Sequence, residues 1–382
     1  MSAPPSAPTN TRGLAGVVAL DSKISAINGD EGTLVYQGYT IEDLARDASF
    51  EETVYLLWNG AMPNQAQLGE LNAQLRAERA LPDGVTNLLR ATPRDANPMA
   101  VLRTAVSYLA AFDPDADADV TDRAAGYRKA IKLTAKMPTI VAAFDRLRKG
   151  LEPVAPRAEG STAFEFLRML TGEEPGARAE EVMDACLVLH ADHGLNASTF
   201  TARVIGSTLA DMYGAVAGAI GALKGPLHGG ANRAVMEMLQ EIDAHDLDTR
   251  EYIEQKLARK EKVMGIGHRV YRTLDPRAKI LGAMLEGLSE EKGEMKWYEM
   301  SVAIQSIIKE EKGLNPNVDF FSASVYYLLG IEPDLYTTIF AVSRTAGWTA
   351  NLLEQWEDNR LIRPRAEYIG PRGKTIVPIA ER

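Results

Sequence analysis

The sequence predicts an all-α fold with more than one domain and one short β-hairpin near the N-terminus. Apolar residues recur at steps of three and four along most of the chain, which is the period of helices with one buried face. The alternation and turn residues typical of strands occur convincingly in one region only. With 382 residues, the chain is long enough for a substantial core and two domains.

The elements follow in order along the chain. The hairpin is expected over 17–39, where Asn28-Gly29-Asp30 and Gly32 supply turn signals. Ser49-Phe50-Glu51-Glu52 matches a capping box that begins a helix, and Asn59-Gly60 ends it. Further helices are expected over 65–81, 99–112, 125–147, 164–170, 180–190 and about 333–356. The proline-containing stretch 148–159 is expected to be an exposed loop.

Composition and charge narrow the class of protein. The net charge of −10, with 46% apolar and 25% charged residues, is ordinary for a globular enzyme and argues against general nucleic-acid binding. Residues 1–13 have no apolar signal core, so we expect a disordered tail on a cytoplasmic protein. The single cysteine, Cys186, excludes an internal disulfide and lies in an apolar run, which favours a buried hydrophobic role.

Residues 204–223 contain a single charge, Asp211, and approach the length of a bilayer span. They are richer in Gly, Ala, Ser and Thr than in Leu and Ile, and a charge within a span is costly, so a helix buried between other helices is expected. Gly214, Gly218, Gly221 and Gly225 recur at helical spacing and would leave one face bare. That face would pack within the chain or against a second copy about a two-fold axis, and we favour the second copy.

Four of the five histidines lie in Gly-rich or polar settings, and His245 is expected to be a solvated surface residue. His190 and His193 are three residues apart in His-Ala-Asp-His-Gly-Leu-Asn, which allows either a metal site or a polar cluster that contacts substrate. Nothing nearby completes a metal cage, so the polar cluster is preferred. His228, in Gly-Pro-Leu-His-Gly-Gly-Ala-Asn, is expected at a junction between two helices.

Residues 256–279 carry a charge of +6 in a chain of net charge −10. Such a basic stretch is either a solvated face or a site for phosphates, and here it encloses Val263-Met264-Gly265-Ile266-Gly267-His268. Apolar residues alternating with glycine suit a backbone loop that lies against a flat base, with phosphates held by the flanking cations. Asp275-Pro276 then predicts the start of a helix, and Arg277 in its first turn could face an anion.

Two further charged residues lie in apolar surroundings. Asp319, in Asn-Pro-Asn-Val-Asp-Phe-Phe, is either a helix N-cap or a general base with a shifted pKa. Arg344 lies within a long apolar helix, either on its solvated side or buried. If it is buried, it needs an anionic partner, which a carboxylate of a ligand would provide.

Together these segments resemble the citrate synthase family over nearly the whole chain, from Gly13-Leu-Ala-Gly-Val-Val to Arg363-Pro-Arg365. The motifs around His228, His268 and Asp319, in this order, carry the resemblance. Length and N-terminus are similar to those of the dimeric bacterial and archaeal form. Gln37, in Tyr-Gln-Gly-Tyr, stands where the family usually has arginine.

The resemblance implies a transferase of the tricarboxylic acid cycle that condenses acetyl-CoA with oxaloacetate. It implies that Asp319 is the base, that His228 hydrogen-bonds the thioester oxygen, and that His268 polarises the ketone of oxaloacetate. The implied oxaloacetate ligands are His193, Arg277, Arg344 and, from the partner subunit of a homodimer, Arg363. The implied CoA contacts are Lys262, Val263, Met264, Gly265, Ile266, Gly267 and Arg272.

The family's architecture implies a large helical domain, 1–229 and 331–382, and a small helical domain, 230–330, that closes over the active site. Neither a metal nor another cofactor is expected, since acetyl-CoA is a substrate. The nearest alternative is a 2-methylcitrate synthase that uses propionyl-CoA, because one methylene supports only about 1–3 kcal/mol of discrimination. Two more distant alternatives are a non-catalytic CoA- or anion-binding protein and a metal hydrolase built on His190 and His193.

Overall fold

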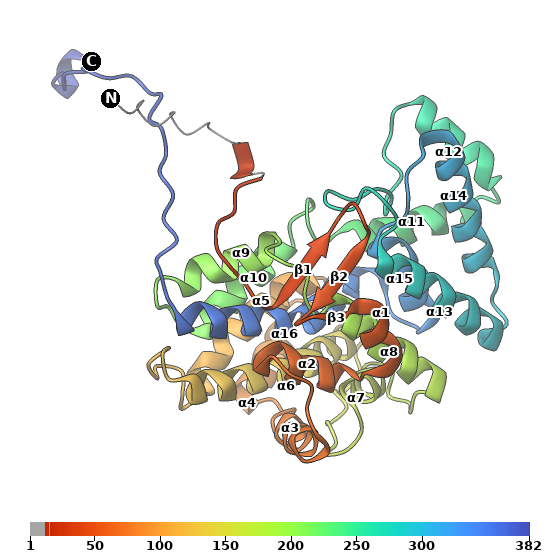
Figure 1. Cartoon of the computed structure of the whole chain (residues 1–382), viewed down its shortest axis with the longest axis horizontal. Coiled ribbons are helices and arrows are strands. Elements are labelled where there is room, and N and C mark those ends of the chain that lie inside the picture. Colours follow the sequence, from red (N-terminus) through yellow and green to blue (C-terminus); the bar gives the residue numbers. More distant parts are fainter. Residues whose placement is uncertain (1–11, 15) are drawn as a thin grey trace.

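The computed structural model describes residues 12–14 and 16–382, and within them the fold is made of α-helices with one small sheet (Figure 1). The tail expected over 1–13 lies outside the described residues except at 12 and 13. The helices are α1 Ile41–Asp47, α2 Phe50–Asn59, α3 Gln65–Ala77, α4 Asp83–Ala91, α5 Pro98–Leu109, α6 Arg123–Arg148, α7 Thr162–Thr171, α8 Ala177–His190, α9 Ala197–Gly206, α10 Met212–Leu223, α11 Ala231–Ala244, α12 Thr249–Ala258, α13 Pro276–Lys292, α14 Lys296–Lys312, α15 Val318–Leu328 and α16 Tyr336–Glu357. The predicted all-α class is confirmed.

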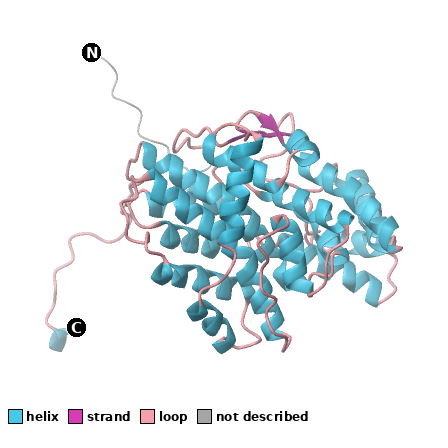
Figure 2. Cartoon of the chain, turned by 90° about the horizontal axis from the view of Figure 1, so that it is seen from below, coloured by secondary structure: helices cyan, strands magenta, loops and turns pink. Residues whose placement is uncertain are grey.

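The predicted hairpin is present as strands β1 (Ser25–Asn28) and β2 (Thr33–Tyr36), which pair antiparallel with Ser25 opposite Tyr36. A third strand, β3 (Tyr39–Thr40), pairs with β2 and was not predicted, because two residues carry no readable alternation. Between β2 and β3 the backbone turns at Gln37 and Gly38, both with positive φ. In Figure 2 the strands lie at one edge of a body built from helices.

Helix α16 runs through the core of the molecule. It packs against α2, α6, α8 and α9, and nearly all of its residues are buried. A long helix that is apolar on every side is stable only where other helices surround it. This is the helix predicted over 333–356, and a short 3₁₀ turn, Pro333–Leu335, precedes it. Cys186 is fully buried in the same core, as predicted.

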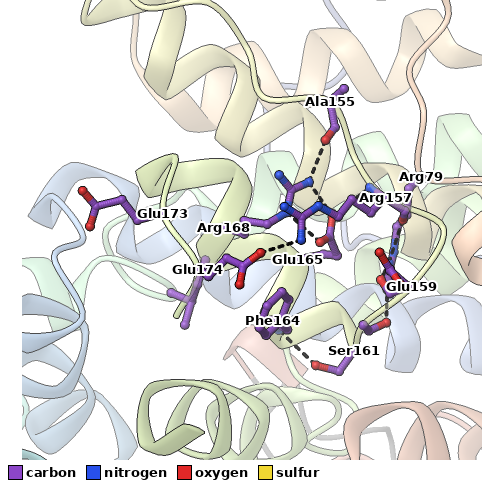
Figure 3. Close-up of polar contacts among 12 residues, drawn as sticks. Arg79, Ala155, Arg157, Glu159, Ser161, Phe164, Glu165, Arg168, Glu173 and Glu174 are labelled. Atoms are coloured by element: carbon purple, nitrogen blue, oxygen red, sulfur yellow. Dashed lines mark hydrogen bonds and ion pairs between the residues drawn. The ribbon is translucent and has the colours of Figure 1, made fainter. Parts of the chain in front are cut away.

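The segment between α6 and α7 is the loop predicted over 148–159, and a buried ion pair holds it in place (Figure 3). Two nitrogens of Arg168 donate to the carboxylate of Glu165 at 2.7 and 2.8 Å. Arg168 also donates to the backbone oxygen of Ala155, and Glu165 accepts the backbone N–H of Arg157. The loop is therefore exposed but anchored by two residues of α7.

Residues 204–223 do not form one helix, so that expectation was wrong. Helix α9 ends at Gly206, and α10 begins at Met212 with Asp211 as its N-cap, whose carboxylate accepts the N–H of Gly214 at 2.9 Å. The charge thus lies at a helix start, where a carboxylate is stabilising. In the described part of the chain, no helix combines the length and apolar character needed to cross a bilayer.

Among the glycines of α10, Gly218 is the one that another helix of the same chain approaches closely. A Cβ atom at Gly218 would come within 2.2 Å of the Cδ1 atom of Ile205, so α9 is the helix that approaches this bare face. Gly225 lies beyond the end of α10 and is not on that face. Packing within the chain therefore accounts for Gly218, and the contact between two copies stays a prediction.

Helices α11 to α15 form a group on one side of the molecule, and the tip of the β1–β2 hairpin reaches toward it (Figure 1). The hairpin tip contacts the segment between α12 and α13: the backbone N–H of Arg272 donates to the oxygen of Gly29 at 2.9 Å. This contact places the end of the hairpin beside His268, whose surroundings form the candidate site.

Candidate active site

Helix α16 places a buried arginine in the interior. Arg344 is 1% exposed, its Nε atom donates a 2.7 Å hydrogen bond to the backbone oxygen of His190, and its guanidinium lies 4.6 Å from the centre of the Phe340 ring. The terminal nitrogens Nη1 and Nη2 have no protein partner. Burial lowers the pKa of Arg344 to about 10, which still leaves it charged at neutral pH. A buried cation with free N–H groups requires an anion for stability.

A second buried arginine begins α13. Asp275 is the N-cap and Pro276 the first helical residue, as predicted. The carboxylate of Asp275 accepts Nε of Arg277 at 3.0 Å and Nη2 at 2.8 Å, so the pair is bidentate and almost fully buried. Asp275 also accepts the backbone N–H of Val318, which joins the starts of α13 and α15. Arg277 is thereby held rigidly at a helix N-terminus, a place that favours anions.

His268 lies between α12 and α13, and its tautomer follows from its hydrogen bonds. The Nδ1 atom accepts the backbone N–H groups of Val270 at 3.0 Å and Tyr271 at 3.2 Å. A nitrogen that accepts hydrogen bonds carries no proton, so the neutral ring has its proton on Nε2. Burial, and then the charge of Arg277, lower the pKa of His268 to about 4. At neutral pH His268 is therefore an uncharged donor through Nε2.

His193 faces His268 across the site. Their ring centres are 5.4 Å apart, and Nε2 of His193 lies 3.2 Å from the hydroxyl of Tyr271. Burial, and then the charges of Arg277 and Arg344, lower the pKa of His193 well below its ordinary value. His193 is located in the turn after α8, so the helical face it was expected to share with His190 is not formed.

His228 lies in the turn between α10 and α11, as predicted. Its Nε2 atom is 2.9 Å from the hydroxyl oxygen of Ser198, and its ring centre is 6.2 Å from that of Phe340. Burial, and then the charge of Arg344, lower the pKa of His228 to about 4. The ring is therefore neutral at physiological pH, with Nε2 held by the protein.

Asp319 is in the first turn of α15, whose N-cap is Asn317, so the N-cap interpretation of Asp319 was wrong. Its side chain is partly buried, and its buried Oδ1 atom has no hydrogen-bond partner. Burial raises the pKa of Asp319 to about 6, against the lowering influence of Arg277. A carboxylate without hydrogen bonds and with a pKa near neutrality has the properties of a general base.

The loop 263–267 is bound to the segment that precedes Asp319. Asn317 donates its backbone N–H to the oxygen of Gly265 at 2.9 Å and its side-chain N–H to the oxygen of Gly267 at 2.8 Å. Gly265 has a φ of +74°, and a Cβ atom there would come within 2.6 Å of Val235, so no larger residue fits. Val263 is also buried, which leaves Met264, Ile266 and Gly267 as the partly exposed part of the loop.

Two cations flank this loop, Lys262 and Arg272, and both are exposed. The guanidinium of Arg272 forms a 3.0 Å ion pair with Asp30 in the hairpin turn. An exposed pair of this kind is worth little and is readily exchanged for another anion.

Arg363 does not join the other predicted residues within this chain. It is exposed in the extended segment that follows α16, and this segment runs away from the body of the molecule (Figure 1).

His190 is fully buried, and its Nδ1 atom lies 2.8 Å from the backbone oxygen of Cys186. Over 12–14 and 16–382, no group of three or more His, Cys, Asp or Glu side chains is arranged to hold a metal ion.

Several residues in these contacts were not identified as functional from the sequence. Ser198 and Tyr271 contact the candidate histidines, and Asp275 holds Arg277. Asp192 anchors the hairpin, since its backbone oxygen accepts the hydroxyl of Tyr36 at 2.7 Å and its carboxylate accepts that of Ser25. Asp192 and Ser198 lie in the motif from His190 onward, and this was the available signal, but a single sequence does not show which side chains turn inward.

The geometry thus combines two buried arginines, three neutral histidines and one carboxylate with a raised pKa. Contacts between these residues place them in one site: His193 faces His268 at 5.4 Å, and Arg344 and His228 lie beside the same Phe340 ring. Asp275 joins Arg277 to the backbone of Val318, next to Asp319. Such a site can bind a small dianion, donate hydrogen bonds to oxygen atoms that gain charge, and accept a proton from carbon.

Comparison with known proteins agrees with this chemistry. A family model described as citrate synthase, C-terminal domain, matches residues 13–365. The citrate synthase of Haloferax volcanii is 57% identical over 97% of this chain and 98% of its own length. Citrate synthase 2 of Bacillus subtilis is 54% identical over 98% of this chain and 100% of its own. The 2-methylcitrate synthase 1 of Corynebacterium glutamicum is 41% identical over 97% of this chain and 98% of its own.

A solved structure extends the similarity to three dimensions. It is the ternary complex of citrate synthase from the thermophilic archaeon Thermoplasma acidophilum with carboxymethyl coenzyme A and oxaloacetate. Its chain is 35% identical to this one and superposes with a TM-score of 0.89, covering 96% of this chain and 98% of the other. The fold described here is therefore also the fold of that complex.

Proposed function

The chain belongs to the citrate synthase family, and on that premise we propose how it condenses acetyl-CoA with oxaloacetate and water to give citrate and CoA. It is an acyltransferase, and the proposal assigns its residues. The observation that carries the assignment is the buried Arg344, whose two terminal nitrogens have no partner. Oxaloacetate carries two carboxylates, and one of them satisfies these nitrogens.

Oxaloacetate is bound by Arg344, Arg277 and His193 in this proposal. The pairing of Arg277 with Asp275 orients the guanidinium, so that little entropy is lost when the substrate binds. His268 presents Nε2–H to the ketone oxygen. As a neutral donor fixed by two backbone N–H groups, it strengthens its hydrogen bond as negative charge develops on that oxygen.

Acetyl-CoA is activated by Asp319 and His228. The carboxylate of Asp319 takes a proton from the methyl carbon, and the electron pair moves toward the thioester oxygen to form an enolate. His228 donates a hydrogen bond to that oxygen through Nδ1, the nitrogen that Ser198 does not hold. The methylene carbon of the enolate then attacks the ketone carbon of oxaloacetate, whose oxygen takes up the charge beside His268. The proton that Asp319 removed balances the one that this oxygen gains to become the hydroxyl of citryl-CoA. Water finally cleaves the thioester of citryl-CoA, which releases CoA and citrate.

The CoA portion is proposed to lie along the loop 263–267, with its phosphates near Lys262 and Arg272. The exposed ion pair of Arg272 with Asp30 supports this, because a phosphate can replace the carboxylate. The reaction changes no oxidation state overall, so the proposal includes no redox cofactor. It includes no metal either, because His228 and His268 supply the hydrogen bonds that stabilise the charge on both oxygen atoms.

We also propose the division into a small domain, 230–330, and a large domain made of 1–229 and 331–382. Substrate groups come from both: His268 and Arg277 from the small one, His193 and Arg344 from the large one. A homodimer is proposed because Arg363 is exposed in the segment after α16 and does not join the other site residues of its own chain. A cytoplasmic location completes the proposal.

Initial rates with acetyl-CoA and propionyl-CoA at saturating oxaloacetate test the function. A higher kcat/KM with acetyl-CoA is expected, in keeping with the higher identity to citrate synthases than to the 2-methylcitrate synthase. A preference for propionyl-CoA would make the chain a 2-methylcitrate synthase. Absence of turnover with either substrate would overturn the proposal.

A further inference from the structure

One buried hydroxyl, that of Ser198, has three polar neighbours. Its Oγ atom is 2.9 Å from Nε2 of His228, 2.8 Å from Oδ1 of Asn196, and 3.1 Å from Nε1 of Trp348. Both Ser198 and Trp348 are fully buried. The hydroxyl therefore has no access to bulk water, and these three groups decide where its proton lies.

The donors and acceptors around Ser198 limit the possibilities. The indole of Trp348 can only donate, so it occupies one lone pair of the hydroxyl oxygen. The Oδ1 atom of Asn196 can only accept, and it lies 2.8 Å from the hydroxyl, within reach of its proton. It also accepts the backbone N–H groups of Ser198 and Thr199, each at 3.1 Å, so a third hydrogen bond has to share a lone pair. Nε2 of His228 is the competing acceptor for the Ser198 proton.

The position of that proton determines which nitrogen of His228 is protonated. If Ser198 donates to Nε2, the neutral ring carries its own proton on Nδ1, where it faces the substrate. If Ser198 donates to Asn196 instead, His228 must donate through Nε2, and Nδ1 has no proton to offer. In the second arrangement the hydroxyl oxygen accepts from both the indole of Trp348 and the imidazole of His228, and two donors to one oxygen weaken each other. The indole N–H therefore favours the first arrangement, in which it is the only donor to Ser198.

Helix α16 also places Trp348 where it can act on His228. Phe340, Arg344 and Trp348 follow one another at intervals of four along α16 and so share one face. The ring centre of Phe340 is 6.2 Å from that of His228, and the charge of Arg344 helps to lower the pKa of His228. Trp348 continues the same face and reaches His228 through Ser198.

We infer that Trp348 is a positioning residue, whose indole N–H directs the Ser198 proton to His228 and so keeps the proton of the imidazole on Nδ1. This rests on the proposed function, in which Nδ1 of His228 serves the thioester oxygen. Trp348 does not touch the reacting atoms, and its effect on them passes through a chain of two hydrogen bonds.

The variant Trp348→Phe removes the N–H and keeps an aromatic ring. Its kcat should fall about three- to tenfold, with the KM for oxaloacetate within about twofold, as expected for one neutral hydrogen bond felt at the transition state. Trp356→Phe is the matched control. Its indole lies two helical turns further along α16, is 6% exposed, and donates to the backbone oxygen of Gly206 at 3.0 Å. Similar melting temperatures with loss of kcat only in Trp348→Phe would support the inference.

A double-mutant cycle separates this route from a general packing effect. In a Ser198→Ala background, Trp348→Phe should cause no further loss of kcat, because the connection to His228 is already broken. An equal loss in both backgrounds would overturn the inference.

The tautomer of His228 can be measured without turnover. This test therefore distinguishes a failure of the inference from a failure of the proposed function. In protein labelled with ¹⁵N-histidine, the nitrogen shifts of His228 should report a proton on Nδ1, and Trp348→Phe should shift the ring toward the Nε2 form. A wild-type His228 protonated on Nε2 would overturn the inference even in an active enzyme.

Discussion

The backbone of Gly29 lies directly against that of Val270: a Cβ atom added to Gly29 would come within 2.1 Å of the carbonyl oxygen of Val270. Gly29 is in the turn of the β1–β2 hairpin, and Val270 follows His268 by two residues. The hairpin is in turn anchored through Tyr36 to Asp192, next to His193. This contact therefore ties the loop of His268 to the element that carries His193.

Replacing Gly29 should separate these two parts of the site. In Gly29→Ala, the methyl group has no room beside a backbone oxygen, so the hairpin tip must move away from the His268 loop. We expect kcat/KM to fall by about 10- to 100-fold, since small displacements of reacting groups have effects of that size. Steady-state kinetics with Gly69→Ala as control would check this, because a Cβ atom at Gly69 meets no neighbour. Equal kinetics in the two variants would show that the contact is dispensable.

Asp319→Asn should remove the base and leave the binding of oxaloacetate nearly unchanged. The expected loss in kcat is about 10²- to 10⁴-fold, the usual range for a positioned acid or base. Asp117→Asn is a suitable control, because that residue is exposed and far along the chain from the candidate site. Kinetics and calorimetric titration with oxaloacetate would measure both quantities. A normal kcat in Asp319→Asn would exclude the residue from the mechanism.

The same carboxylate should make stability depend on pH. Its pKa is raised from 3.8 to about 6 in the folded state, so between these values the folded protein holds a proton that the unfolded chain has lost. The stability contributed by this residue therefore decreases as pH rises through that window, by up to about 3 kcal/mol.

Asp319→Asn cannot ionise, so it should be more stable than the wild type at pH 8, while near pH 4 the two should converge. Thermal unfolding of both proteins across this range would give the difference. A gap of the same size at pH 4 and pH 8 would mean that ionisation of Asp319 is not its cause.

Arg344→Gln should abolish the stabilisation that oxaloacetate provides. In the wild type, a concentration one hundred times Kd should stabilise the fold by about 2.7 kcal/mol. The variant lacks the two free guanidinium nitrogens and should show little rise in Tm at the same concentration. Arg360→Gln, at an exposed position, serves as control. A full oxaloacetate effect in Arg344→Gln would place the substrate elsewhere.

Arg363→Ala tests whether the active site is shared between subunits. Alone, it should lower activity strongly, because one carboxylate of oxaloacetate would lose a ligand. Mixing these subunits with inactive Asp319→Ala subunits should restore part of the activity, since each mixed dimer has one site with neither defect. Recovery would be measured after subunit exchange has been verified by mass spectrometry. If exchange occurs without recovery, Arg363 acts within its own chain or has no role.

Much of the fold was predictable because helices are local. The capping box at Ser49 and Glu52, the N-cap Asp275 with Pro276, and the long helix that contains Arg344 were all predicted from the sequence and are confirmed. The errors arose where a local pattern allowed two outcomes. Asp211 could interrupt or join a helix, and Asp319 could cap a helix or follow the cap.

The sequence by itself determined the all-α class, the order of the motifs and, through their resemblance to one family, the reaction. These properties depend on residue types and on spacing within short segments, where hydrogen bonds reach only three or four residues. The tertiary structure alone decided which side chains are left without partners, as at Arg344, and which nitrogen of His268 carries the proton. It also decided that Gly218 meets Ile205 and that Trp348 meets Ser198. Burial and hydrogen bonding between segments about 150 residues apart arise only when the chain has folded, because no local pattern records the far partner.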